Sequence, residues 1–135
     1  MLLAGNAAWA ASPAWPQYRG PNRDGISTET GLFADLAKGG PKQIWKAAIG
    51  MGYSSVAVAD GLAYASGNVK DTDTLFCFDA LTGKEVWRDS YPCKLTDGQS
   101  EGGPAATPTV SEGAVYGLSR DGDVFRLDAK SGQLA

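Results

Sequence analysis

The sequence has no histidine and only two cysteines in its 135 residues. Without histidine the chain cannot build a Ser–His or Cys–His nucleophile, and the usual zinc ligand sets are missing as well. Lysine and arginine occur singly and the formal net charge is −3, so there is no positive stripe for nucleic acid or an anionic membrane. No apolar run approaches the ~20 residues that a membrane-spanning helix needs. These absences exclude the common hydrolase sites and make nucleic acid and the bilayer poor candidates as partners.

The two cysteines, Cys77 and Cys93, do not form a CxxC pair. One disulfide between them is feasible in an oxidising compartment. Cys77, however, lies inside a strand pattern like a small buried hydrophobe, and Cys93 lies in a loop. The sequence therefore favours two free thiols and leaves the pairing open.

Glycine and aromatic residues are abundant, with 18 Gly, 4 Trp, 5 Tyr and 4 Phe. The hydrophobic content of 43% and the charged content of 20% are typical of a globular chain. Long apolar heptad patterns are missing. This composition predicts short strands joined by tight turns, with little helix.

The N-terminal stretch has two parts. Residues 1–12, "MLLAGNAAWAAS", resemble a residual signal peptide, because Ala8-Trp9-Ala10 has the small-x-small form of a cleavage site, although a positive n-region is missing. Residues 13–41 form a turn-rich arm, which we expect to lie against the surface and to be held there by Trp15 and Tyr18. The chain is accordingly expected in the periplasm or outside the cell.

An internal repeat organises the remainder of the chain. Residues 55–66, "SVAVADGLAYAS", align with residues 107–118, "TPTVSEGAVYGL", at an offset of 52. Residues 74–83, "TLFCFDALTG", align with residues 123–132, "DVFRLDAKSG", at an offset of 49. The difference falls in a turn. Each unit has the alternation and turn spacing of consecutive antiparallel strands, so the sequence predicts stacked β-sheet repeats.

The repeat predicts an all-β fold, a partial β-propeller of antiparallel four-stranded blades. We expect a closing strand at 42–49, a blade at about 53–92 and a partial blade at about 105–135. Trp45 and Trp87 are one blade length apart. About two blades plus one strand cannot close a ring, so residues 42–135 are interpreted as an incomplete propeller, the N-terminal part of a larger protein.

In the segment "DALTGKEVW", which begins at Asp79, each fixed position is expected to have a structural role. Asp79 ends a strand and can accept hydrogen bonds from the amides two and three residues on, and Thr82 can support it with its hydroxyl. Gly83 allows a positive φ and leaves its peptide plane open to a large side chain. Trp87 is placed to cover such a peptide in a neighbouring unit, where burial removes roughly 150–250 Å² from water. The second copy repeats this pattern with Asp128, Ser131 and Gly132.

Asp-x-x-Thr-Gly-x-x-x-Trp after an aromatic strand resembles the tryptophan-docking repeat of the pyrroloquinoline-quinone-type β-propellers. That group includes quinoprotein alcohol dehydrogenases and a non-enzymatic outer-membrane assembly lipoprotein. The opening "WPQYRGPNRDGIS" also resembles the N-terminus of a bacterial subgroup of quinone-binding-like propellers, sometimes labelled polyvinyl-alcohol-dehydrogenase-like. The resemblance covers about residues 14–135. It departs from the family at Cys77 and Arg126, where a small alanine is usual. The structural motif residues that it implies are Trp45, Asp79, Thr82, Gly83, Trp87, Asp128, Ser131 and Gly132.

Two functions from different classes follow from this resemblance. The leading hypothesis is an exported scaffold or protein-interaction module of the cell envelope, without catalysis of its own and without a cofactor in this stretch. The alternative is the N-terminal part of a quinoprotein dehydrogenase of the alcohol or polyvinyl-alcohol type, which the resemblance implies would use pyrroloquinoline quinone with Ca²⁺, a catalytic Asp and adjacent cysteines. No residue here matches those features, so no catalytic, cofactor-binding or metal residue is assigned. A sugar- or polymer-binding surface is a third, weaker hypothesis.

Two pairs of carboxylates lie on predicted hairpin tips, Asp71 with Asp73 and Asp121 with Asp123. Paired carboxylates on a turn suit a hard cation such as Ca²⁺. A calcium loop needs more oxygen ligands at alternating positions than either pair offers. We therefore expect solvated hairpin tips.

Overall fold

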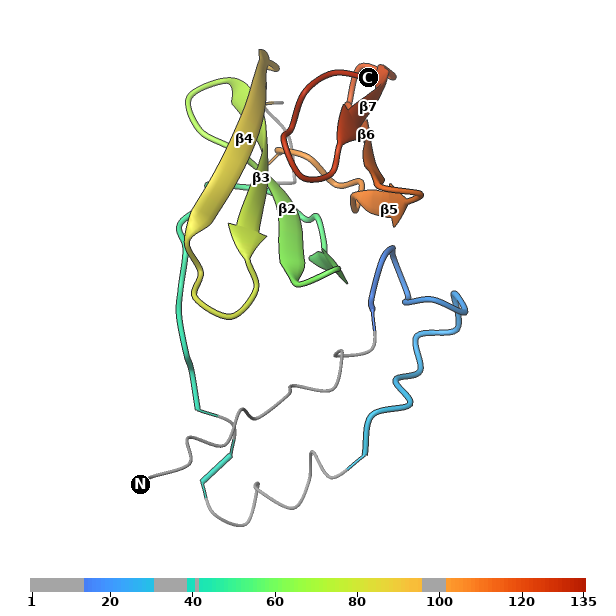
Figure 1. The fold of residues 1–135 in the computed structure, drawn as a ribbon. Helices are drawn as coiled ribbons and strands as arrows, with labels where there is room; N and C mark the ends of the chain where they lie inside the picture. Colours follow the sequence, from blue (N-terminus) through green and yellow to red (C-terminus); the bar gives the residue numbers. More distant parts are fainter. Residues whose placement is uncertain (1–13, 31–38, 41, 96–101) are drawn as a thin grey trace, which may run out of the picture.

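The computed structural model describes residues 14–30, 39–40, 42–95 and 102–135, and within them it contains seven β-strands and no helix (Figure 1). The strands form two antiparallel sheets, one ordered β1-β2-β3-β4 and the other β5-β6-β7. Antiparallel four-stranded blades were predicted, and the sheets confirm an all-β, partial β-propeller fold. The strands are β1 (Ala57–Ala59), β2 (Leu62–Asn68), β3 (Thr72–Asp79), β4 (Glu85–Pro92), β5 (Thr109–Ser111), β6 (Ala114–Leu118) and β7 (Val124–Asp128).

Tight turns join the first two strands of each sheet at equivalent places in the repeat. Asp60 and Gly61 have φ values of 51° and 77°, and Glu112 and Gly113 have φ values of 50° and 75°. Two successive positive φ angles are the signature of a type I′ turn, whose twist matches that of the flanking strands. The Asp-Gly and Glu-Gly pairs thus set the register of both hairpins.

The sharp turns after β3 and β7 are closed by an aspartate. The Asp79 Oδ1 atom accepts hydrogen bonds from the Thr82 backbone N at 2.8 Å and from its Oγ1 at 2.7 Å. The Asp128 Oδ1 atom does the same with Ser131, at 2.8 Å to the backbone N and 2.8 Å to the Oγ. Local side-chain bonds of this kind stabilise a turn independently of the sheet. Both copies of the motif therefore have the same closed shape.

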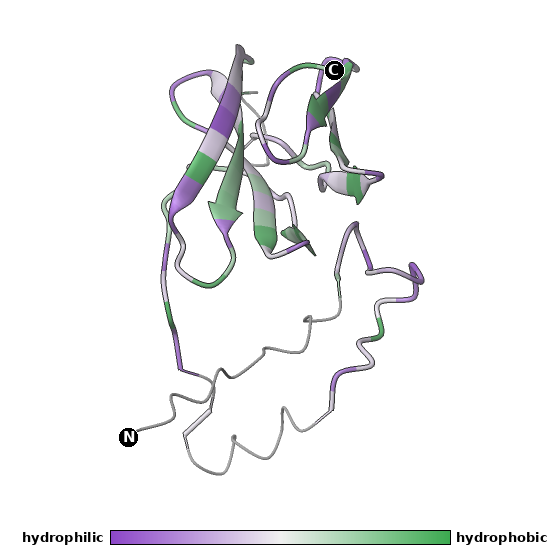
Figure 2. Ribbon diagram, in the orientation of Figure 1, coloured by the Kyte–Doolittle hydropathy of each residue, from purple (hydrophilic) through white to green (hydrophobic). Residues whose placement is uncertain are grey.

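One hydrophobic core connects the two sheets. β3 is buried along most of its length because it is covered on both faces, whereas β4 has buried residues mainly on one face. Figure 2 shows the corresponding colours: β3 is largely hydrophobic, and β4 alternates between hydrophilic and hydrophobic residues. No helix in the described residues is long and apolar enough to cross a membrane. The core residues are Ala57, Tyr64, Leu75, Cys77, Trp87, Val115, Leu127 and Ala129.

Residues 42–49 were expected to form a strand, but they form no ladder with another strand. Next to them, Met51 pairs with Asn68 only through an isolated bridge. The segment approaches β2 so closely that a Cβ atom on Gly67 would lie 1.9 Å from the Ile49 carbonyl oxygen. The strand prediction was wrong because an outer strand needs the third strand of its own blade as a partner, and the described residues contain no such neighbour.

Residues 133–135 lie beside β7 but form only an isolated bridge with it. Leu134 forms an isolated bridge with Leu127, and the Ala135 backbone N donates a hydrogen bond to the Arg126 carbonyl oxygen at 3.0 Å. These contacts lie on the free edge of β7. Residues 133–135 therefore occupy the place where the fourth strand of this sheet was expected to start.

The aspartate turns predict a measurable pKa effect. The side-chain hydrogen bond from Thr82, together with the backbone bonds, lowers the pKa of Asp79, and Ser131 lowers the pKa of Asp128 in the same way. A lowered pKa means that the ionised turn is stabilised at neutral pH and that this stabilisation is lost as the pH falls through the folded-state pKa. We expect Thr82→Val to raise the pKa of Asp79 towards that of an ordinary aspartate, as measured by carboxyl ¹³C NMR titration. Asp128 is the internal control, and an unchanged Asp79 pKa would contradict the assigned hydrogen bond.

Candidate functional site at the junction of the two sheets

Trp87 of β4 joins the first sheet to the second. A Cβ atom built on Gly132 would lie 2.6 Å from the Trp87 ring, so the indole covers the glycine directly. The indole Nε1 donates a hydrogen bond to the Ala129 carbonyl oxygen at 3.0 Å. The Tyr64 ring packs against the indole with a centroid distance of 5.9 Å. Only 9% of Trp87 is exposed, and its ring is enclosed by both sheets.

Trp45 makes the corresponding contacts one repeat earlier. A Cβ atom on Gly83 would lie 2.6 Å from the Trp45 ring, and the Trp45 Nε1 donates to the Ala80 carbonyl oxygen at 2.9 Å. The Phe78 ring lies 5.9 Å from the Trp45 ring between centroids. An indole therefore covers the turn after β3 just as another covers the turn after β7.

Gly83 and Gly132 meet two requirements at once. Both have a φ of 70°, which disfavours any side chain, and both face an indole ring that leaves no space for a Cβ atom. The two requirements have one origin, because the aspartate turn brings the glycine into the left-handed region and turns its flat peptide outwards. Glycine is the residue that satisfies both.

Tyr64 is a part of this junction that the sequence reasoning missed. It is fully buried, and its hydroxyl donates a hydrogen bond to the Ala129 carbonyl oxygen at 3.0 Å. Burial raises the pKa of Tyr64 far above its usual value, so the phenol stays protonated and able to donate. The Ala129 oxygen thus accepts hydrogen bonds from two side chains of the first sheet. The repeat alignment places Tyr64 on Tyr116, but it does not indicate that Tyr64 contacts the other sheet.

The loops between the sheets are also linked through their backbones. The Pro104 carbonyl oxygen accepts hydrogen bonds from Tyr53 N at 2.9 Å and Ser54 N at 3.1 Å. Ser55 N donates to Thr107 Oγ1 at 3.2 Å. These bonds hold the entry to the second sheet against the entry to the first.

Three of the four carboxylates considered as calcium ligands, those of Asp71, Asp73 and Asp123, have other partners. Asp73 is only 2% exposed, and its Oδ1 accepts a hydrogen bond from Asn68 Nδ2 at 2.6 Å, so the expectation of a solvated tip was wrong for this residue. Asp71 Oδ1 accepts from Leu95 N at 2.9 Å. Ser119 donates its hydroxyl to Asp123 Oδ2 at 3.2 Å. Across the described ranges, no group of three or more acidic, cysteine or histidine side chains is arranged to hold a metal ion.

Cys77 and Cys93 are both free and buried. Burial raises the pKa of Cys77 to about 11, and burial also raises the pKa of Cys93. Both thiols therefore stay protonated at neutral pH. Since the thiolate is the reactive form, neither cysteine is a nucleophile in this environment.

The described residues do not match the quinone site that the family resemblance implied. A quinone needs an open aromatic face, but Trp87 is covered by Gly132 and packed against Tyr64. The cysteines are not adjacent in the chain. Of the motif residues, Trp87 and Gly132 are in contact between the two sheets.

Comparison with known proteins identifies relatives with this repeat. Residues 30–135 match the family described as outer membrane protein assembly factor BamB. The outer membrane protein assembly factor BamB of Burkholderia pseudomallei (strain K96243) is 33% identical over 87 residues, which is 60% of this chain and 21% of that protein. This chain therefore spans about a fifth of that relative's length.

Among solved structures, a europium-containing methanol dehydrogenase superposes with a TM-score of 0.48 and 23% identity, covering 59% of this chain and 14% of that one. That likeness is too partial to bear on activity. The family match, in contrast, extends over most of the chain. The chain therefore belongs to the family of the outer membrane protein assembly factor BamB and is a stretch of a pyrroloquinoline-quinone-type repeat protein.

Proposed function

We propose that this chain is part of an exported β-propeller scaffold that binds proteins of the cell envelope and has no catalytic activity of its own. The observation that carries the proposal is the double hydrogen bond to the Ala129 oxygen from Tyr64 and Trp87. It supports a joining role for the motif tryptophan, whose ring is 9% exposed between the two sheets. The Burkholderia relative is an outer membrane protein assembly factor, which supports a scaffold role.

In this proposal the repeat motif is a tryptophan-docking device. The aspartate turn presents a flat glycine peptide and a carbonyl oxygen, and the tryptophan of the preceding blade covers the first and donates to the second. Burying one indole contributes on the order of 4–6 kcal/mol before entropy is subtracted. The residues assigned to this device are Trp45, Asp79, Thr82, Gly83, Trp87, Asp128, Ser131 and Gly132.

Location and partner are proposed on the same basis. We place the protein in the periplasm or outside the cell, with a protein of the cell envelope as its partner. The signal-like residues 1–12 lie outside the described residues, so this part of the proposal rests on their sequence and on the relative's name. Cys77 and Cys93 are both free and buried, so they favour neither an oxidising nor a reducing compartment.

A cofactor titration tests the scaffold proposal against the dehydrogenase alternative. Pyrroloquinoline quinone is titrated into the full-length protein by calorimetry, with and without Ca²⁺. We expect no saturable heat under either condition, because the Trp87 ring is enclosed between the two sheets. Saturable binding that depends on Ca²⁺ would overturn the non-catalytic proposal, and dye-linked oxidation of alcohols would establish the alternative.

A pair of glycine variants tests the docking role. Gly113 and Gly132 have φ values of 75° and 70°, but a Cβ atom on Gly113 meets nothing within 4 Å, whereas one on Gly132 would lie 2.6 Å from the Trp87 ring. Gly113→Ala should destabilise by about 1–2 kcal/mol through backbone strain alone. Gly132→Ala should cost about 1–3 kcal/mol more through overpacking. Urea unfolding measures both, and equal losses would show that the indole does not press on Gly132.

The shared Ala129 oxygen predicts non-additive variants. Tyr64→Phe or Trp87→Phe alone removes one donor and leaves the other in place. The double variant leaves a buried carbonyl without a partner, which adds about 1–3 kcal/mol to the sum of the single losses. The free energies of unfolding of the four proteins complete the double-mutant cycle. Additivity within about 0.5 kcal/mol would mean that the two side chains act independently.

A further inference from the structure

The N-terminal arm pairs with the first strand of each sheet through its backbone. Trp15 N donates to the Val58 carbonyl oxygen at 2.8 Å, and Val58 N donates to the Trp15 carbonyl oxygen at 2.9 Å. The next residue of the arm, Pro16, accepts a hydrogen bond from Val110 N at 2.7 Å. Two consecutive residues of the arm thus connect β1 of one sheet to β5 of the other.

The two strand positions that receive the arm are equivalent in the repeat. Val58 is the middle residue of β1 and Val110 is the middle residue of β5. Val58 is opposite Ala63 of β2, but its own N–H and C=O both bond to Trp15. In an antiparallel pair, alternate residues direct their hydrogen bonds away from the partner strand. The arm therefore binds outward-facing backbone groups at the equivalent position of two successive repeats. It uses the N–H and C=O of Val58 and the N–H of Val110.

These edges lie where the two sheets converge. β1 and β5 are the strands through which the sheets approach each other most closely, and the arm lies beside β5 in Figure 1. In a propeller the blades surround a central channel, and the converging strands face it. The edges that the arm covers are therefore the inner edges of two neighbouring blades.

The arm has a folded shape of its own. A Cβ atom on Gly20 would lie 2.7 Å from the Trp15 ring, and Arg19 and Gly20 both have positive φ values, 62° and 78°. Gly25 N donates to the Arg19 carbonyl oxygen at 2.9 Å, and Arg19 Nη2 donates to the Asp24 carbonyl oxygen at 3.1 Å. These bonds lower the entropy that the arm loses when it docks, as in a preorganised ligand.

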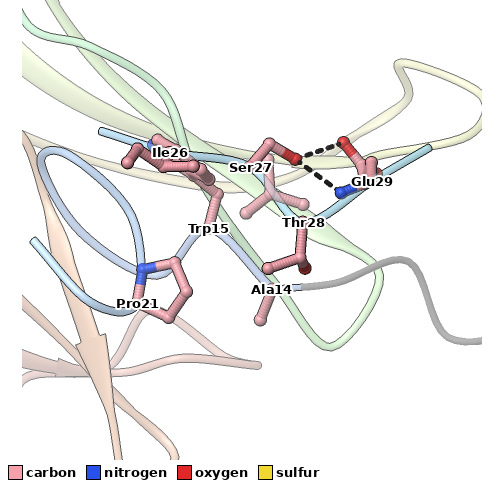
Figure 3. A pocket seen from close by; sticks show the side chains of 8 residues that line it. Ala14, Trp15, Pro21, Ile26, Ser27, Thr28 and Glu29 are labelled. Atoms are coloured by element: carbon pink, nitrogen blue, oxygen red, sulfur yellow. Dashed lines mark hydrogen bonds between the residues drawn. The ribbon is translucent and has the colours of Figure 1, made fainter. Parts of the chain in front are cut away.

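The arm leaves part of the space beside β1 empty. A cavity of about 250 Å³ lies between the start of the arm and its return limb, with Val58 of β1 in its wall. Figure 3 shows Trp15, Pro21 and Ile26 on one side of this cavity and Ser27, Thr28 and Glu29 on the other. The arm thus contacts the sheet as a ligand contacts a site, through a few backbone bonds and one aromatic residue.

We propose that the inner edges of β1 and β5 form a binding site for an extended peptide and that residues 14–26 are the ligand that fills it in the intact chain. The site offers a donor and an acceptor at Val58 and a donor at Val110. The peptide must supply a donor and an acceptor at one residue and an acceptor at the next, and proline serves at the second position because no N–H is needed there. The matching ligand is an extended segment with a Trp-Pro pair. As a tethered ligand, the arm has a high effective concentration and excludes such a peptide from solution.

The test uses a fluorescently labelled synthetic peptide of residues 14–26 and the full-length protein, with binding followed by anisotropy. Trp15→Ala in the protein weakens its own arm. We expect the peptide to saturate this variant and to bind the unchanged protein at least tenfold more weakly. Equal binding to both proteins, or no binding to the variant, would refute the proposal.

Two further variants in the Trp15→Ala background locate the bound peptide. Val58→Pro removes the N–H that donates to the arm and no ladder bond, because the backbone groups of Val58 bond to Trp15. Val58→Thr is the matched control, since it keeps both the N–H and the branched side chain. We expect binding to be lost with proline and kept with threonine. Equal binding to the two variants would place the peptide elsewhere.

Amide hydrogen exchange keeps the proposal testable if the variants fold poorly. In the unchanged protein, the Val58 and Val110 amides should exchange slowly, because the arm covers them. In the Trp15→Ala variant these two amides should become fast while those of Ala57 and Ala59, which bond within the sheet, stay slow. Fast exchange of Val58 and Val110 in the unchanged protein would by itself contradict the proposal.

Discussion

An indole ring lying on the flat peptide of a glycine is the contact on which this structure depends. Trp87 spans the gap between the sheets, covers Gly132 and donates to the Ala129 oxygen, which Tyr64 also approaches. In a repeat protein each unit contacts its neighbours, and the interfaces between units contribute to the stability of every sheet. The docked indole provides that neighbour at a fixed distance. The repeat is thus a means of placing successive sheets side by side.

The same contact decides which chemistry is open to the chain. A tryptophan enclosed by a glycine and a tyrosine cannot also serve as the floor of a cofactor site, and protonated, buried thiols do not react. The inner edges of β1 and β5 carry hydrogen-bonding groups in equivalent positions, and the arm uses them at Val58 and Val110. Addition of an extended segment to a sheet edge is a recurring mode of peptide recognition.

The parts of this structure that could be predicted from the sequence are those that local bonds determine. The aspartate turns, the positive φ of Gly83 and the hairpins all depend on residues within a few positions of one another. Other features depend on distant partners and left no local pattern: the hydroxyl of Tyr64 donates to the Ala129 carbonyl oxygen, and the Asn68 amide donates to the Cys93 carbonyl oxygen. The expected strand at 42–49 failed for the same reason, since alternation shows that a segment can pair but not that a neighbour exists. The arm was expected to lie against the surface through Trp15 and Tyr18. Trp15 does bond to Val58, but Tyr18 is 64% exposed, and no local pattern predicted the pairing with two strands.

The most direct measurement of the central contact is the NMR chemical shift of the Gly132 α protons in the full-length protein. A proton above an indole ring is shifted strongly upfield by the ring current. If Trp87 covers Gly132, these protons will show that shift, and it will disappear in Trp87→Leu while the corresponding shift at Gly83, beneath Trp45, remains. Gly132 protons at ordinary positions in the unchanged protein would show that the indole lies elsewhere, and the proposed basis of sheet association would be wrong.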